Sequence, residues 1–129
     1  MKKLTLVLLF AVVGTWVFAD GPKTYDSSAM RDIMHSNAAT YGAVSKAIDA
    51  GDWAAAADGF IQFAANAKRA LGYLPPKGDP QEWKKIWTDF QFNAYKGVGA
   101  AGEGNADEAK EYLSDIAADR NKGHPAFKG

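Results

Sequence analysis

Apolar residues recur at alternating spacings of four and three in four separate segments of this chain. The first segment has Ser27 or Ser28 as a suitable N-cap and stops at Gly51. Its stripe comprises Met30, Met34, Asn37, Tyr41, Val44 and Ile48. Because this spacing follows one face of an α-helix, the pattern predicts a helix with one side turned toward a core.

The second segment repeats the same rhythm from Asp52, and Gly72 provides its natural end. Its stripe comprises Trp53, Ala57, Phe60, Ala64, Ala67 and Leu71. The following stretch, residues 73–78, contains two consecutive prolines and a glycine, which a helix could not cross. The sequence therefore predicts a second helix and then a loop.

The third segment begins with Asp79 as a cap and Pro80 in the first turn, where proline is well tolerated. Its stripe comprises Trp83, Ile86 or Trp87, Phe90, Ala94 and Val98. Four glycines between residues 97 and 104 weaken its end, so we expect this helix to fray near Ala101.

The fourth segment opens at Asn105 or Asp107, and its stripe consists of Ala109, Leu113, Ile116 and Arg120. An arginine at the end of an apolar stripe must either reach water or meet an acid. Gly123 and Pro125 predict that the helix becomes irregular around His124, because a residue before proline favours extended backbone.

Four helices with one apolar stripe each and short links are best satisfied by an all-α fold, an antiparallel up-down-up-down four-helix bundle. In this topology the start of the first helix and the end of the fourth lie at the same end. We therefore expect Met30, Met34 and His35 to approach His124.

The first 19 residues form a separate unit. Lys2 and Lys3 precede an apolar run from Leu4 to Val13, and small residues end the segment at Ala19. This arrangement is typical of a cleaved export signal and is short for a membrane span. The prediction is a signal peptide at 1–19, with a retained membrane anchor as the alternative, and a bundle domain at 20–129. Cleavage of the signal would give a periplasmic location and no membrane association.

Composition excludes several classes of function and of binding site. Removing the signal leaves 13 basic and 15 acidic residues, which offers no basic surface for nucleic acid. The chain has no cysteine, which excludes disulfides, thiolate metal sites and a cysteine nucleophile. No nucleophile and base, phosphate loop or spaced carboxylate pair is visible, so we do not expect an enzyme.

The C-terminal tail resembles the end of the last helix in class II c-type cytochromes, the cytochrome c-prime family. That family carries Cys-x-x-Cys-His, then an aromatic residue three positions later and a basic residue. Here His124, Phe127 and Lys128 occupy the histidine, aromatic and basic positions, while Arg120 and Gly123 stand where the cysteines would be. The resemblance retains the type of haem ligand without its covalent attachment.

The resemblance extends over residues 27–128. Met30, or Met34 one turn later, corresponds to the methionine that can serve as the second axial ligand. Ala67-Lys68 with the proline-containing link after it, and Ile86-Trp87 with Phe90, are similar to the family's second helix, following loop and Ile-Trp-x-x-Phe segment.

What the resemblance implies is a periplasmic haem protein that transfers electrons to a redox partner. The haem would be noncovalent, with His124 as one axial ligand and Met30 or Met34 as the other; a small b-type cytochrome of the same architecture uses such Met and His ligation. The implied cofactor-binding residues are His124, Met30, Met34, Arg120, Trp87 and Phe90. A homodimer is also left open.

Two alternatives remain at this point. One is a haem-free descendant of the family, a bundle that binds a partner or small ligand. The other is a copper protein, because thioethers and imidazoles suit cuprous copper and Met30, Met34, His35 and His124 are expected at one bundle end.

Overall fold

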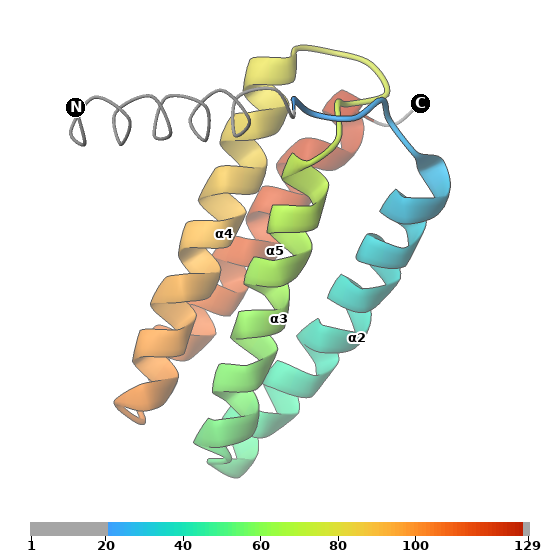
Figure 1. Ribbon diagram of the computed structural model, residues 1–129. Coiled ribbons are helices and arrows are strands. Elements are labelled where there is room, and N and C mark those ends of the chain that lie inside the picture. Colours follow the sequence, from blue (N-terminus) through green and yellow to red (C-terminus); the bar gives the residue numbers. More distant parts are fainter. Residues whose placement is uncertain (1–20, 128–129) are drawn as a thin grey trace, which may run out of the picture.

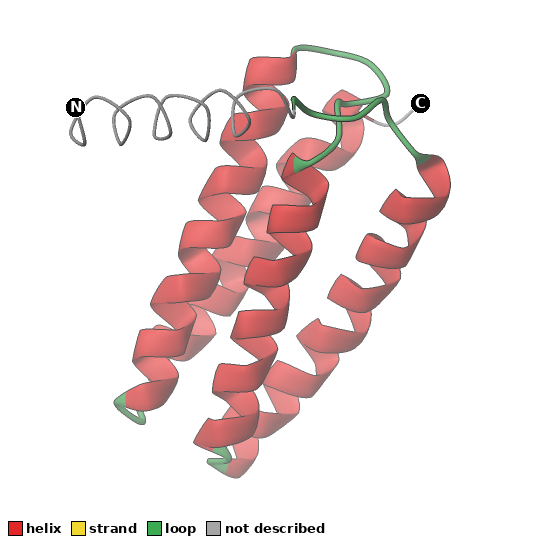
Figure 2. Ribbon diagram, in the orientation of Figure 1, coloured by secondary structure: helices red, strands yellow, loops and turns green. Residues whose placement is uncertain are grey.

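The computed structural model describes residues 21–127, and almost all of them lie in four helices. These are α2 (Ser27–Ala50), α3 (Trp53–Leu71), α4 (Pro80–Gly102) and α5 (Ala106–Phe127), and Figure 2 shows no strand among the described residues. The all-α prediction is confirmed. The segment predicted as a signal peptide, and Lys128, lie outside the described residues.

The four helices form a bundle in which each packs against two neighbours. α2 packs on α3, α3 on α4, α4 on α5, and α5 on α2, the last pair making the least contact. Following the colours in Figure 1, consecutive helices run in opposite directions. The start of α2 and the end of α5 consequently lie at the same end of the molecule.

Each helix begins at a side chain that accepts hydrogen bonds from the first exposed amides. Asp26, Asp52 and Asp79 cap α2, α3 and α4, and Asn105 accepts from the Glu108 amide at 3.1 Å to start α5. For α2 the prediction of a serine cap is wrong by one or two residues. Asp26 accepts from two amides at once, at 3.0 and 3.1 Å.

One end of the bundle is formed by the two tight turns, α2–α3 and α4–α5. Gly51 and Gly104 adopt φ of 69° and 66°, a left-handed conformation that suits glycine. A Cβ on Gly104 would lie 3.4 Å from the indole nitrogen of Trp53, so the two turns are neighbours. We call the half of the bundle next to these turns the closed half.

Helix packing in the closed half depends on two glycines. Gly59 of α3 faces Val44 of α2, and Gly97 of α4 faces the ring of Phe60 of α3, so closely that an added Cβ would overlap either partner. The backbones therefore approach more closely than any larger residue would allow. Phe60 is completely buried in this contact.

The other half, which we call the open half, holds the α3–α4 loop, the start of α2 and the end of α5. The segment before α2 crosses this loop: Lys23 and Tyr73 form an isolated parallel β-bridge, with backbone hydrogen bonds of 2.8 Å to Gly72 and from Leu74. This pairing fixes where the chain enters α2.

Two stripe predictions are corrected by the structure. Tyr41 is exposed while Thr40 is buried on α2, and Arg120 is exposed while Asp119 is buried on α5. The cause is the helical period of 3.6, which lets a count in steps of four drift off the buried face after a few turns. From Ile116, three further positions lead to the core side and four lead away from it.

The predicted irregularity around His124 is also wrong, because α5 continues through Gly123 and Pro125 to Phe127. Proline removes one backbone donor, leaving the carbonyl of Asn121 without its helical partner. Asn121 is exposed, so water can satisfy that oxygen near the end of the helix. His124 is therefore presented from helical backbone.

Candidate functional site

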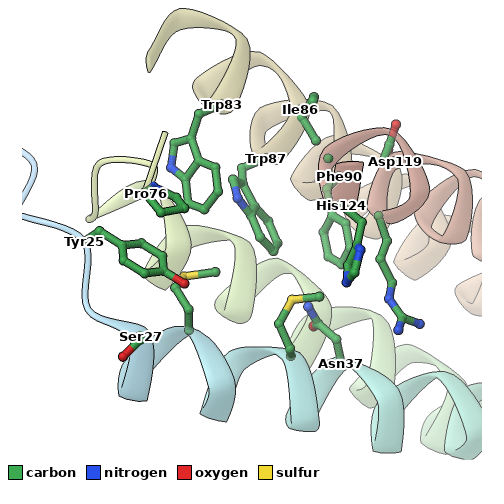
Figure 3. A pocket seen from close by; sticks show the side chains of 14 residues that line it. Tyr25, Ser27, Asn37, Pro76, Trp83, Ile86, Trp87, Phe90, Asp119 and His124 are labelled. Carbon is green, nitrogen blue, oxygen red and sulfur yellow. The ribbon is translucent and has the colours of Figure 1, made fainter. Parts of the chain in front are cut away.

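A cavity of about 470 Å³ opens between α2, α4 and α5 in the open half (Figure 3). Tyr25, before α2, and Pro76, in the α3–α4 loop, close one side of it. The lining consists of Tyr25, Ser27, Met30, Met34, Asn37, Pro76, Trp83, Ile86, Trp87, Phe90, Asp119, Arg120, Gly123 and His124. The volume is within the range of small-molecule and cofactor sites.

The structure brings all six predicted cofactor-binding residues to this one pocket. Met30, Trp87 and Phe90 are buried, Met34 is half-buried, and Arg120 and His124 are exposed. In Figure 3, the imidazole of His124 extends from α5 beside Phe90 toward the α2 side of the cavity. One imidazole and two thioethers, about 90 residues apart in the chain, thus share one hollow.

Aromatic contacts connect the side chains of the α4 wall to one another and to the core. The rings of Trp83 and Trp87 meet edge to face at 5.8 Å, and Trp87 and Phe90 lie 5.2 Å apart. Phe90 continues into the core through an edge contact of 5.7 Å with Phe63. The Trp83 indole nitrogen donates to the Tyr73 carbonyl at 2.9 Å, which fastens the start of α4 to the loop.

A buried polar network reaches the pocket from α3. Asn66, with no exposed surface, donates to Asn37 Oδ1 at 2.8 Å and to Ser36 Oγ at 2.9 Å, and it accepts from Gln62 at 3.0 Å. Asn37 is only 5% exposed and lines the cavity. The sequence placed Asn37 on the apolar stripe of the first helix, and no role was predicted for it. A polar residue at a position expected to be buried was the sign that Asn37 has hydrogen-bond partners inside the bundle.

Asp119 is the second polar residue that sequence reasoning missed. It is buried between α4 and α5, where Asn93 donates to its Oδ2 at 2.9 Å. Burial raises the pKa of this carboxyl, while the Asn93 hydrogen bond and nearby Lys122 oppose the rise. In Figure 3 the carboxyl points away from the cavity.

The copper alternative loses one of its four ligands. His35 is exposed and does not line the cavity, unlike Met30, Met34 and His124. Within residues 21–127, no three side chains of the histidine, cysteine, aspartate or glutamate types are arranged to hold a metal ion. Met30, Met34 and His124 are the predicted copper ligands that share the cavity.

Comparisons with protein-family models, curated proteins and solved structures found no match to this chain. None of the helices in the described part of the chain combines the length and apolar character that a membrane crossing requires.

Proposed function

We propose that this protein is a haem-binding, electron-transfer bundle that holds haem without covalent attachment, with His124 and either Met30 or Met34 as axial ligands. The observation that carries the proposal is the sharing of one aromatic-walled cavity by an imidazole from α5 and two thioethers from α2. Export to the periplasm and an exchange of electrons with a redox partner are part of the same proposal.

The residues around the cavity fit such a group. The α4 wall offers flat apolar surface from Trp83, Trp87 and Phe90. Arg120 offers a cation to the edge of the haem that carries its carboxylates. Imidazole and thioether are ligands that haem iron accepts together, and bound haem would supply one-electron redox chemistry. Within this chain, the aromatic wall would face the porphyrin ring, and α2 and α5 would supply the ligands.

Each ligand is carried on an element whose position is already fixed. α2 is capped by Asp26 and follows the Lys23–Tyr73 bridge, so Met30 sits one turn inside a well-defined helix start. His124 extends from continuous helix, on the opposite side of the hollow. Ligands that need little rearrangement lose little conformational entropy on binding.

The test is an absorption spectrum of the chain titrated with haemin, oxidised and reduced. We expect a Soret band that saturates at one haem per chain, with sharp bands in the reduced form. His124→Ala should abolish these features. His35→Ala is the matched control, since His35 is exposed and away from the cavity, and it should leave the spectrum unchanged.

Met30→Leu and Met34→Leu then identify the second ligand, because leucine keeps a similar volume and removes the sulfur. Only the ligating position should change the reduced spectrum. A wild-type chain without a Soret shift, or equal spectra for wild type and His124→Ala, would eliminate the proposal. The remaining explanations would be a haem-free binding module and a copper protein that uses Met30, Met34 and His124.

A further inference from the structure

The polar groups around the cavity are unevenly distributed. Asn37 and Arg120 line both the main cavity and a neighbouring hollow of about 190 Å³, so they flank the boundary between the two. Toward the end of the bundle, the cavity is lined instead by Tyr25, Met30 and Trp83. The main cavity thus has one polar, cationic end, where it meets the neighbouring hollow, and one aromatic, apolar end.

The amide of Asn37 is held in one orientation. Its Oδ1 accepts from Asn66, whose own oxygen is already used by Gln62, so the Asn37 nitrogen is directed away from Asn66. Figure 3 shows this nitrogen at the cavity end of the side chain. Among residues 21–127, the side-chain nitrogen of Asn37 has no hydrogen-bond acceptor. Because every fully buried side-chain nitrogen or oxygen in this range has a partner, the Asn37 nitrogen must reach open space. Asn37 therefore offers a donor to the cavity.

Burying this network has an energetic cost that packing alone would not require. A leucine of similar size at position 37 or 66 would fill the same space without the need for hydrogen-bond partners. The carboxyl of Asp119, the one acid among the described residues that line the cavity, is turned toward Asn93. An anion at the polar end of the cavity would meet the side-chain N–H of Asn37 and the guanidinium of Arg120.

We infer that Asn37 and Arg120 form a carboxylate subsite, that Asn66 is a positioning residue for Asn37, and that the cavity takes a largely apolar ligand carrying a carboxylate. The inference deepens the proposed function and rests on it in assigning a ligand to the same cavity. The carboxylate has two sources, a porphyrin side chain or the head of a linear aliphatic acid. The chemistry of recognition is the same for both.

The experiment uses two matched ligand pairs: iron-free protoporphyrin IX with its dimethyl ester, and dodecanoic acid with dodecanol. Binding is followed by the fluorescence of Trp83 and Trp87, which line the cavity. Wild type should prefer the acid over its neutral partner about tenfold or more in at least one pair, since hydrogen bonds to charged groups are the stronger ones. The pair that shows the preference identifies the source of the carboxylate.

Asn37→Leu should reduce the preference, because only the Arg120 guanidinium then remains, and it should leave the dissociation constant of the neutral ligand unchanged. Asn66→Leu should do the same through loss of orientation, whereas a purely structural role would weaken both members of a pair alike. Gln91→Leu is the control: Gln91 donates to Tyr95 on α4, lies outside both hollows and the Asn66 network, and the preference should survive. Equal affinities in wild type for both pairs, or a preference that is undiminished in Asn37→Leu, would overturn the inference.

Two features keep the test independent of folding and of iron. Should Asn37→Leu not fold, the side-chain NH₂ signal of Asn37 in the NMR spectrum of wild type must shift with the acid and stay in place with its neutral partner. Because the ligands contain no iron, a chain that prefers the acids and shows no haemin spectrum would refute the proposed function alone.

Discussion

The closed and open halves of the bundle contain the same four helices, yet they pack in opposite ways. In the closed half, Gly59 and Gly97 allow the backbones to approach until Val44 and Phe60 fill all the space between them. In the open half, larger side chains surround a cavity of about 470 Å³. The contact between α2 and α5 is the weakest of the four helix pairs.

The difference shows where this fold gains stability and where it retains room for a ligand. Close packing maximises dispersion contacts and leaves no space for water, whereas a hollow forfeits those contacts. Both kinds of packing in one bundle suggest that the closed half anchors the helices while the open half holds the functional groups. Substitutions in the two halves should therefore have different costs.

The largest difference is expected between Phe60→Ala and Phe90→Ala. Both rings are buried, but Phe60 is enclosed in the closed half and Phe90 has the cavity along one side. Phe60→Ala should cost about 3–5 kcal/mol of unfolding free energy and Phe90→Ala below about 3 kcal/mol. Urea denaturation measures both. Equal costs would mean that the cavity is filled by side chains in solution.

A smaller effect is expected from two alanines on α4. Gly97→Ala inserts a methyl group into the Phe60 ring and should lower stability by about 1–3 kcal/mol. Gly99→Ala, two residues along the same helix, meets nothing within 4 Å and should raise stability by up to about 1 kcal/mol. Thermal unfolding of the two variants gives the sign directly, and a stabilised Gly97→Ala would disprove close packing in the closed half.

The smallest effect concerns pH and the open half. Because burial raises the pKa of Asp119, the folded chain binds more protons than the unfolded chain between the ordinary aspartate pKa and the raised value. Stability should therefore fall as pH rises through that window and remain lower above it. Asp119→Asn keeps an oxygen for Asn93 and should melt at a higher temperature than wild type at neutral pH.

The difference in melting temperature between Asp119→Asn and wild type should vanish in stronger acid. There the Asp119 carboxyl of wild type is protonated in both the folded and the unfolded chain. Glu111→Gln provides the control, since Glu111 is an exposed acid on the same helix and is not among the groups that shift the pKa of Asp119. A higher melting temperature for wild type than for Asp119→Asn at neutral pH would contradict the assignment of a buried, desolvated carboxyl.

Much of the bundle could be predicted because local signals and apolar periodicity agree along the chain. Asp52, Asp79 and Asn105 cap helices where their positions predicted, and Gly51 ends α2 as expected. The convergence of His124 with Met30 and Met34 also followed from topology, since an even number of antiparallel helices returns the chain to its starting end.

The choice of polar groups inside the bundle could not be predicted in the same way. Whether Asp119 or Arg120 faces inward depends on about 100° of helix rotation, which the nearby Asn93 helps to decide. Asn37 acquires its orientation only through Asn66, 29 residues later. The sequence by itself determined the helices, most of their ends and their order, because these depend mainly on residues within a turn or two. The tertiary structure alone decided the cavity and its polar end, because they depend on how distant side chains meet.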